Sequence, residues 1–318
     1  MLYVLLIFLV FLLGLWFWIT QPLFSQPKTV ISVSVDPARL EAHVKRLSVE
    51  LTPRDQTHPA SLDRAAAFIR AQFEDSGALV TEQPYDVNGK VYRNVVARFG
   101  PETKSRIVVG AHYDTAGALP GADDNASGVA GLIELAHLLG KQPPPMRIEL
   151  VAFTLEEPPS FRSWQMGSAI HAASLRDQGV SVRAMISLEM IGYFTDEPRT
   201  QRVPAPFLGA FYPSEGNFIA VVGRLSEGLL VRRIKIAMRG ATPLPVYSIN
   251  APTVVPGIDF SDQLNYWNAG YDAVMITDTA FLRNQNYHTT YDTSEKLDYK
   301  RMSMVVTGVY AATLALAE

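Results

Sequence analysis

The sequence of 318 residues contains no cysteine. This absence excludes a disulfide framework, catalysis by a thiol and metal sites built from thiolates. A bound metal ion would therefore have to be held by imidazole and carboxylate groups. The sequence also has no internal repeat and no low-complexity run, and hydrophobic residues make up 48% of it. We therefore expect a large hydrophobic core rather than a repeat array or a disordered chain.

The sequence has no block of basic residues, and its formal net charge is −3. Proteins that bind nucleic acids rely on Lys and Arg to release counterions from the phosphate backbone. The charge balance therefore argues against nucleic acid as a partner.

Charged residues are also absent from the N-terminal segment between Leu2 and Thr20, which is rich in Leu, Val, Ile and Phe. As a helix, a segment of this length spans a hydrocarbon core of about 30 Å. Trp16 and Trp18 lie near its end, where an interfacial aromatic belt is expected. The sequence therefore predicts contact with a membrane through residues 2–20.

A cleaved signal peptide is the alternative interpretation of this segment. A signal peptide normally has a shorter apolar region, a basic start and a cleavage site of small residues, and none of these is clear here. We expect residues 1–28 to be a retained anchor with its tether and residues 29–318 to be the folded domain. We also expect that domain to face the extracytoplasmic side, although no basic residue precedes Lys28 to set the orientation.

The remaining sequence alternates between helical and strand-like patterns. Helices are predicted over 37–49, 61–76, 127–139, 167–178 and 299–316, with another after residue 222, and strands over 91–99, 106–111, 147–153, 184–188, 218–222 and 273–276. Alternating strands and helices are typical of an α/β fold. We predict a mostly parallel, mixed central sheet that is flanked by helices on both faces.

Five residues of the types that bind metals stand next to these predicted elements. They are His112, Asp124, Glu157, Glu189 and His288. Three of them end or follow predicted strands, one lies at a turn that enters a helix, and one lies in a loop after the last strand. Ligands of open α/β sheets bind outside the carboxyl ends of the strands. We therefore expect these five side chains to form one site.

Several segments around these residues resemble a known family. They are GAHYDT (110–115), PGADDNASGVAGLIELAHLL (120–139), VAFTLEE (151–157), LEMIGY (188–193) and YHTTYDT (287–293), with a weaker match at SDQLNYWNAGY (261–271). They are similar to segments of the co-catalytic di-zinc exopeptidases of metallopeptidase family twenty-eight, which includes the bacterial leucyl aminopeptidases and aminopeptidase Y. The resemblance covers about residues 37–318 and implies the zinc-exopeptidase architecture.

The resemblance implies a role for each matched residue. His112 and Glu189 would bind one zinc ion, Glu157 and His288 the other, and Asp124 would bridge the two. Glu156 would be the general base, and Asp114 would orient His112. Glu189 stands where the family commonly has Asp, and Gln263 stands where relatives often carry His.

The chemistry of a two-zinc site requires this set of side chains. Two dications about 3.5–4 Å apart repel each other unless an anion such as a carboxylate lies between them. A further carboxylate has to stay off the metals to carry the proton of the attacking water, and neighbouring Glu156 and Glu157 can divide these two tasks. Asp114 can accept the second N–H of the His112 imidazole.

Each of these residues also has a purely structural interpretation. Asp123-Asp124-Asn125 could form a turn with a helix N-cap, the Glu156–Glu157 pair could be solvated, and Glu189 could be structural. The two rival functions are a glutaminyl-cyclase-like zinc enzyme and a non-catalytic binding ectodomain on the same fold. The cyclases that the chain resembles keep a single-metal set, and a binding module should have lost ligands or the base.

We therefore predict a membrane-anchored zinc aminopeptidase that binds two Zn²⁺ and acts on peptides with a free N-terminus. We expect Met190, Tyr193, Tyr266 and Tyr287 to line the substrate pocket. The stretches 158–166, 198–213 and 241–257 are expected to form the rim of the cleft.

Overall fold

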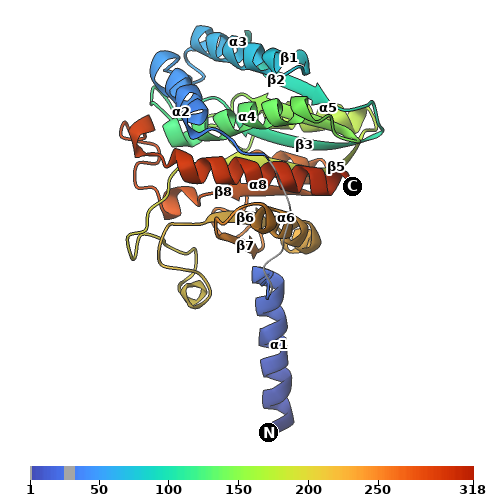
Figure 1. Cartoon of the computed structure of the whole chain (residues 1–318), viewed down its shortest axis with the longest axis vertical. Helices are drawn as coiled ribbons and strands as arrows, with labels where there is room; N and C mark the ends of the chain where they lie inside the picture. Colours follow the sequence, from blue (N-terminus) through green and yellow to red (C-terminus); the bar gives the residue numbers. More distant parts are fainter. Residues whose placement is uncertain (1, 25–32) are drawn as a thin grey trace.

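A computed structural model describes residues 2–24 and 33–318. An eight-stranded sheet runs through the domain in the order β1-β2-β4-β3-β5-β8-β6-β7 (Figure 1). The strands are β1 (Leu79–Val87), β2 (Lys90–Phe99), β3 (Ser105–His112), β4 (Arg147–Phe153), β5 (Ser181–Glu189), β6 (Ile219–Gly223), β7 (Val246–Asn250) and β8 (Ala273–Thr277). The sheet is mixed, as predicted. Neighbours β4-β3-β5-β8 and the pair β6-β7 are parallel, while β1-β2, β2-β4 and β8-β6 are antiparallel.

Helices cover the two faces of the sheet unequally. One face packs against α2 (Pro37–Lys45), α3 (Pro59–Asp75), α4 (Gly128–Lys141), α6 (Gly228–Ala241) and α8 (Tyr299–Ala317). The other face packs against only α5 (Gly167–Asp177) and the short α7 (Gln263–Asn268). Because side chains alternate along a strand, Ile107 and Val109 of β3 enter the first core while Val108 enters the second.

Among the residues that the structure describes, no helix packs on the second face over β6 and β7. The helices α5 and α7 contact β2, β5 and β8, so apolar side chains such as Ala220 and Val222 of β6 lie beyond them. A long loop that contains the short helix η3 (Pro206–Ala210) approaches this part of the sheet instead. The remaining short helices are η1 (Arg46–Glu50), η2 (Ala122–Ser127), η4 (Leu225–Glu227), η5 (Ala280–Leu282) and η6 (Ser294–Lys296).

Two strands were not predicted from the sequence. Strand β1 is an edge strand with a mixed polar pattern and a proline at residue 84, which is a poor strand signal. Strand β7 lies at the other edge and falls inside a stretch that was interpreted as rim.

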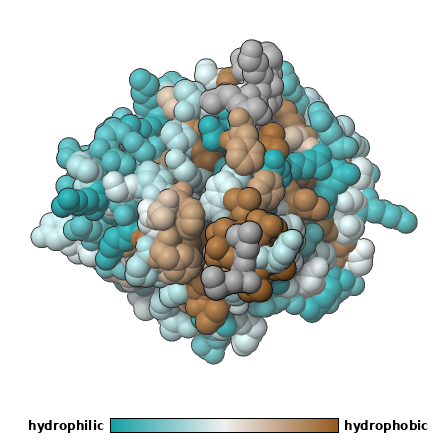
Figure 2. Space-filling view, turned by 90° about the horizontal axis from the view of Figure 1, so that it is seen from below, coloured by the Kyte–Doolittle hydropathy of each residue, from teal (hydrophilic) through white to brown (hydrophobic). Residues whose placement is uncertain are grey.

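Helix α1 (Leu2–Thr20) projects from the domain at the end where β6 and β7 lie (Figure 1). By length and composition it could cross a membrane, although a signal sequence would pass the same test. Seen from the side where α1 projects, hydrophobic residues gather in the middle of the view and hydrophilic residues form most of its rim (Figure 2). The predicted boundary between residues 28 and 29 lies outside the described residues.

Candidate active site

The six acidic and imidazole side chains of the expected site lie together at the carboxyl ends of three neighbouring parallel strands. His112 ends β3, the pair Glu156–Glu157 follows β4, and Glu189 ends β5. Two more residues come from loops: Asp124 lies in η2, and His288 lies between η5 and η6. The strands that end at these residues are apolar and buried, so packing in the core fixes the backbone at their carboxyl ends.

Asp124 lies between the two histidines. Its Oδ1 is 3.3 Å from Nε2 of His112, and its Oδ2 is 3.0 Å from Nε2 of His288. Each histidine has a second carboxylate beside it, because Glu189 Oε2 lies 3.3 Å from His112 Nε2 and Glu157 Oε2 lies 3.2 Å from His288 Nε2. One carboxylate therefore joins two groups of donors.

These contacts define two candidate metal-binding groups that share Asp124. The first consists of His112, Asp124 and Glu189, and the second of Asp124, Glu157 and His288, with ligand atoms within 4.8 Å of one another in each. A third combination of the same kind is His112 with Glu156 and Glu157. Glu156 Oε2 is 3.9 Å from His112 Nε2, which is the longest of these carboxylate–imidazole distances.

Burial and hydrogen bonding indicate that the donors suit divalent cations. His112 and the four carboxylates are at most 6% exposed, and buried charges are costly unless they are paired or coordinate a metal. His112 Nε2 and Glu157 Oε1 are buried and have no hydrogen-bond partner in the described part of the chain. Imidazole nitrogen and carboxylate oxygen are the ligands that zinc takes when no thiolate is present.

The titration behaviour of the site reflects the crowding of these acids. Burial, together with the charge of Asp124, raises the pKa of Glu157 to about 8. Burial also raises the pKa of Glu156 well above its ordinary value, and Glu157 and Glu189 add to this effect. Burial alone would raise the pKa of Asp124, but the neighbouring imidazoles of His112 and His288 hold it below its usual range.

Asp114 supports the site in a way that the sequence did not reveal. Its two carboxylate oxygens accept the backbone N–H groups of Glu156 and Glu157 at 3.0 and 3.1 Å. The Nδ1 atom of His112 lies 3.2 Å from the main-chain oxygen of Asp114 and 3.6 Å from its carboxylate. Asp114 therefore orients the acidic pair with its side chain and contacts the imidazole through its main chain.

Glu189 is held by serines that the sequence analysis missed. Ser261 Oγ donates to Glu189 Oε2 at 2.6 Å, and the hydroxyl groups of Ser261 and Ser187 lie 3.0 Å apart. Ser261 opens the segment 261–271 that was recognised as a weaker match, so this match was the available signal. These hydrogen bonds fix the position of the Glu189 side chain, which is one methylene longer than the Asp that the family commonly has here.

The turn that carries Asp124 is held from the opposite side. The carboxylate of Asp292 accepts the backbone N–H groups of Asp123 and Asp124 at 3.0–3.2 Å. Asp123 itself points away from the histidines, because its oxygens accept from the Gly192 N–H and the Asn284 side chain. Asp123 thus holds the turn in place and lies outside the two groups of donors.

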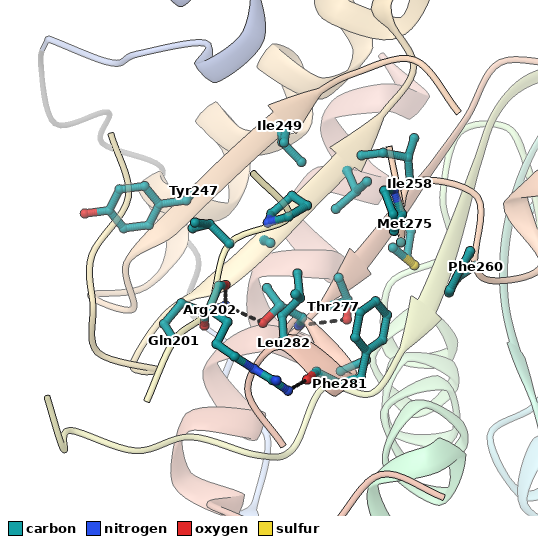
Figure 3. A pocket seen from close by; sticks show the side chains of 18 of the residues that line it. Gln201, Arg202, Tyr247, Ile249, Ile258, Phe260, Met275, Thr277, Phe281 and Leu282 are labelled. Carbon is teal, nitrogen blue, oxygen red and sulfur yellow. Dashed lines mark hydrogen bonds between the residues drawn. The ribbon is translucent and has the colours of Figure 1, made fainter. Parts of the chain in front are cut away.

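An apolar pocket of about 840 Å³ adjoins this charged centre (Figure 3). Its floor includes Val222 of β6 and Ile249 of β7, on which no described helix packs from this side, and Met275 of the neighbouring β8. A smaller cavity of about 420 Å³ lies over the charged centre itself. The two share Glu189, Phe260 and Tyr287, so the pocket opens beside the candidate metal ligands.

The loop 198–213 covers the pocket and is tied down on both sides. The Arg202 N–H donates to the Leu282 oxygen at 2.9 Å, and the Gln201 side chain donates to Thr279 Oγ1 at 2.8 Å. On the other side, the Tyr212 hydroxyl donates to the main-chain oxygen of Ser248 in β7 at 2.8 Å. Parts of all three predicted rim stretches contribute: Pro158 and Phe161 to the smaller cavity, and residues 201–204 and Ile249 to the larger pocket.

Of the four residues that we expected to line the pocket, only Tyr287 does so in the structure. Tyr266 is fully buried, and its hydroxyl lies 2.6 Å from Nδ1 of His171 in the second core. Met190 is also fully buried, and Tyr193 packs against the first core. These predictions were wrong because the sequence does not show which aromatic side chains turn toward the sheet.

Known proteins of similar sequence share most of the chain. It is 48% identical over 281 residues to the uncharacterized protein YfbL of Escherichia coli K12, with 86% of each chain covered. It is 25% identical over 289 residues to leucine aminopeptidase 1 of Metarhizium robertsii, covering 86% of this chain and 67% of the relative.

Solved structures share the fold at low sequence identity. The zinc aminopeptidase BSAP of Bacillus subtilis matches with a TM-score of 0.72 and 14% identity over 89% of this chain and 95% of that one. A glutaminyl cyclase of Bacteroides thetaiotaomicron matches with a TM-score of 0.68 and 20% identity over 89% of this chain and 98% of that one. The fold therefore hosts both a hydrolase and a cyclase.

The family to which the chain belongs follows from its sequence. The model of peptidase family M28 matches residues 94–313, which include the two histidines and all the carboxylates of the site. The chain belongs to peptidase family M28.

Proposed function

We propose that the protein is a di-zinc aminopeptidase that removes N-terminal residues with large apolar side chains from peptides. The observation that carries the proposal is the position of the Asp124 carboxylate, with one oxygen near each imidazole. His112, Asp124 and Glu189 would hold one ion, and Asp124, Glu157 and His288 the other. Bound there, the zinc ions would lower the pKa of the attacking water and polarise the scissile carbonyl group.

Glu156 is the proposed general base. Its carboxylate lines the cavity over the centre, and no side-chain hydrogen bond holds it among the described residues. It can therefore accept a proton from water and pass it to the leaving amine. Asp114 fixes its backbone through the N–H of Glu156, and it fixes Glu157 in the same way.

The apolar pocket is the proposed site for the side chain of the N-terminal residue. Its walls are largely apolar, and only its inner end reaches Glu189 and Tyr287. A peptide with its first side chain in the pocket would place its α-amine beside the Glu189 carboxylate and its first peptide bond over Asp124. The peptidase family and the relative named leucine aminopeptidase 1 support a substrate that binds with its N-terminal residue in the pocket.

The domain limits and location are part of the same proposal. Residues 1–28 would form the anchor and tether, and residues 29–318 the peptidase domain, facing the extracytoplasmic side. The length and composition of α1 support an anchor.

Hydrolysis of a panel of aminoacyl amides by the purified full-length chain tests the reaction. We expect release of amine from Leu and Phe derivatives by the wild type and almost none by Glu156→Gln. Cyclisation of an N-terminal glutaminyl peptide, without hydrolysis of any aminoacyl amide, would instead favour the glutaminyl-cyclase reaction seen on the same fold. The absence of any turnover in a metal-loaded chain would favour the binding module.

A further inference from the structure

The end of helix α1 is built into the domain. Lys235 of α6 donates to the main-chain oxygens of Thr20 and Gln21 at 2.9 and 3.0 Å, and Ser248 Oγ of β7 donates to the Thr20 oxygen at 2.8 Å. Thr20 and Gln21 are buried. The last carbonyls of a helix otherwise need water or a cap, and a cation also favours the negative end of the helix dipole. The domain therefore caps this helix.

Side chains on two sides hold the preceding turn of α1. The Trp18 indole donates to the main-chain oxygen of Leu225 at 3.0 Å, and a Cβ on Gly228 would lie 3.1 Å from the Trp18 ring. The Trp16 ring lies 6.5 Å from the ring of Phe211, centroid to centroid, in the loop that covers the pocket. One side of this turn therefore contacts the domain, while Phe17 and Trp18 stay 38% and 43% exposed.

The described part of α1 that lies outside these contacts is shorter than the hydrocarbon core of a bilayer. Residues 16–20 lie beside the domain, so 14 residues of α1 from Leu2 to Leu15 remain, or about 21 Å of helix. A hydrocarbon core is about 30 Å thick. If α1 crosses a membrane, lipid has to reach the contact between α1 and the domain.

The surface around this contact is apolar and exposed. Phe207 is 67% exposed and Leu229 is 77% exposed, and Phe211 and Leu225 are exposed as well. The loop with η3 extends toward the level of α1 (Figure 1), and further hydrophobic residues lie among more polar ones on this face (Figure 2). We call these four residues, Phe207, Phe211, Leu225 and Leu229, the apolar collar.

The charges beside the collar match a lipid surface. Helix α6 carries Arg232, Arg233, Lys235 and Arg239 and no acidic residue. The Arg232 guanidinium lies 5.4 Å from the centre of the Phe17 ring and donates to the Pro22 oxygen, so it sits at the depth of the collar. Basic side chains at this depth attract the anionic headgroups of phospholipids.

We propose that the apolar collar lies in the interfacial layer of a lipid bilayer. The contacts between α1 and the domain hold this face, together with the loop over the apolar pocket, at the membrane surface. The partner is the bilayer itself. This contact does not depend on which reaction the charged centre performs.

The absence of cysteine allows a direct test with single labels. Phe207→Cys, Leu229→Cys, Leu9→Cys and Leu79→Cys in the full-length chain are labelled with an environment-sensitive fluorophore. Each is reconstituted into vesicles of phosphatidylcholine and phosphatidylglycerol that contain lipids with a nitroxide near the headgroup or deep in the acyl chain. Leu79 is the matched control, because it is 63% exposed on β1, at the opposite end of the domain from α1.

We expect shallow nitroxides to quench the labels at residues 207 and 229, deep nitroxides to quench the label at residue 9, and neither to quench the label at residue 79. Quenching at residue 9 without quenching at 207 and 229 would show that the domain stands off the bilayer and would overturn the proposal. Absence of quenching at residue 9 would overturn it too, because α1 would then not be inserted.

A second set of variants tests the clamp. Lys235→Met removes the donor to the last carbonyls of α1, and Lys141→Met removes an exposed lysine of α4 as a control. In Lys235→Met the label at residue 9 should stay quenched while shallow quenching at residue 207 falls, and Lys141→Met should change neither. Unchanged quenching at residue 207 in Lys235→Met, with α1 inserted, would contradict the clamp.

Discussion

The charged centre and the apolar pocket meet at Glu189 and Tyr287, but the fold builds them in opposite ways. The centre collects acids and imidazoles from the loops at the ends of β3, β4 and β5, and each is positioned by hydrogen bonds. The pocket is a part of the sheet face that lacks a covering helix, closed by the loop 198–213. Under the proposed function, the centre would set the reaction and the pocket would set which side chain is accepted.

Removal of metal should produce the largest effect, and it should separate the two regions. Exhaustive chelation should abolish hydrolysis, and zinc or cobalt should restore it, because buried His112 Nε2 and Glu157 Oε1 have no hydrogen-bond partner among the described residues and suit a metal ion. The pocket contains no candidate metal group apart from Glu189 at its edge. Binding of an apolar amino-acid amide to the chelated protein, measured by calorimetry, should therefore persist in weakened form. Hydrolysis that survives with metal verified absent would contradict a metal-dependent centre.

The acidic pair provides a matched comparison within the centre. Glu156→Gln should reduce kcat by roughly 10²–10⁴ while zinc content stays near that of the wild type, because it removes only a proton acceptor. Glu157→Gln should lower zinc content as well, because Glu157 Oε2 lies beside His288 in one metal-binding group. Metal analysis and kinetics of the two variants decide the assignment. Loss of zinc in Glu156→Gln alone would reverse the two roles.

Glu189 lies between the charged centre and the apolar pocket. Loss of the hydrogen bond that holds its side chain should therefore have an intermediate effect on zinc affinity or activity. Ser261→Ala removes the hydrogen bond to Glu189 Oε2 and should cost roughly 10- to 100-fold in zinc affinity or activity. Glu189→Asp should weaken the binding of one zinc ion and lower kcat, because the backbone at residue 189 lies at the distance that suits the longer Glu side chain. Zinc titration followed by calorimetry measures both effects. Wild-type affinity in both variants would show that Glu189 is not a ligand.

A change in the pocket alone should have the smallest effect on turnover and the clearest effect on selectivity. Ala220→Phe on β6 would fill part of the pocket without touching the centre. We expect KM for Leu and Phe amides to rise by about 10-fold and the kinetics for Ala amide to change little. An equal loss for all three substrates would indicate that the pocket does not bind the N-terminal side chain.

The two regions also differ in how well the sequence predicts them. His112 and Glu157 follow short buried strands, so the strand pattern and the metal-ligand types together placed them at one edge of the sheet. Ala220 and Val222 lie in the continuous apolar run Ile219–Gly223, which has the same pattern as a strand covered on both faces. Only the three-dimensional arrangement reveals that no helix packs on them, and for this reason the pocket was not predicted.

The details of positioning were similarly hidden. The sequence suggested that Asp114 would orient His112, but hydrogen bonds of the Asp114 carboxylate go to backbone N–H groups, whose directions depend on a turn that no side-chain pattern encodes. The contact of Ser261 with Glu189 joins residues 72 positions apart in the sequence. Such pairs depend on which strands become neighbours in the sheet.

Anomalous diffraction at the zinc absorption edge from crystals of the full-length chain tests the central claim most directly. The account predicts two peaks about 3.5–4 Å apart, one bounded by His112, Asp124 and Glu189 and the other by Asp124, Glu157 and His288. A single peak among His112, Glu156 and Glu157, with Asp124 not in contact, would contradict the two-metal centre and the assignment of Glu156 as the base.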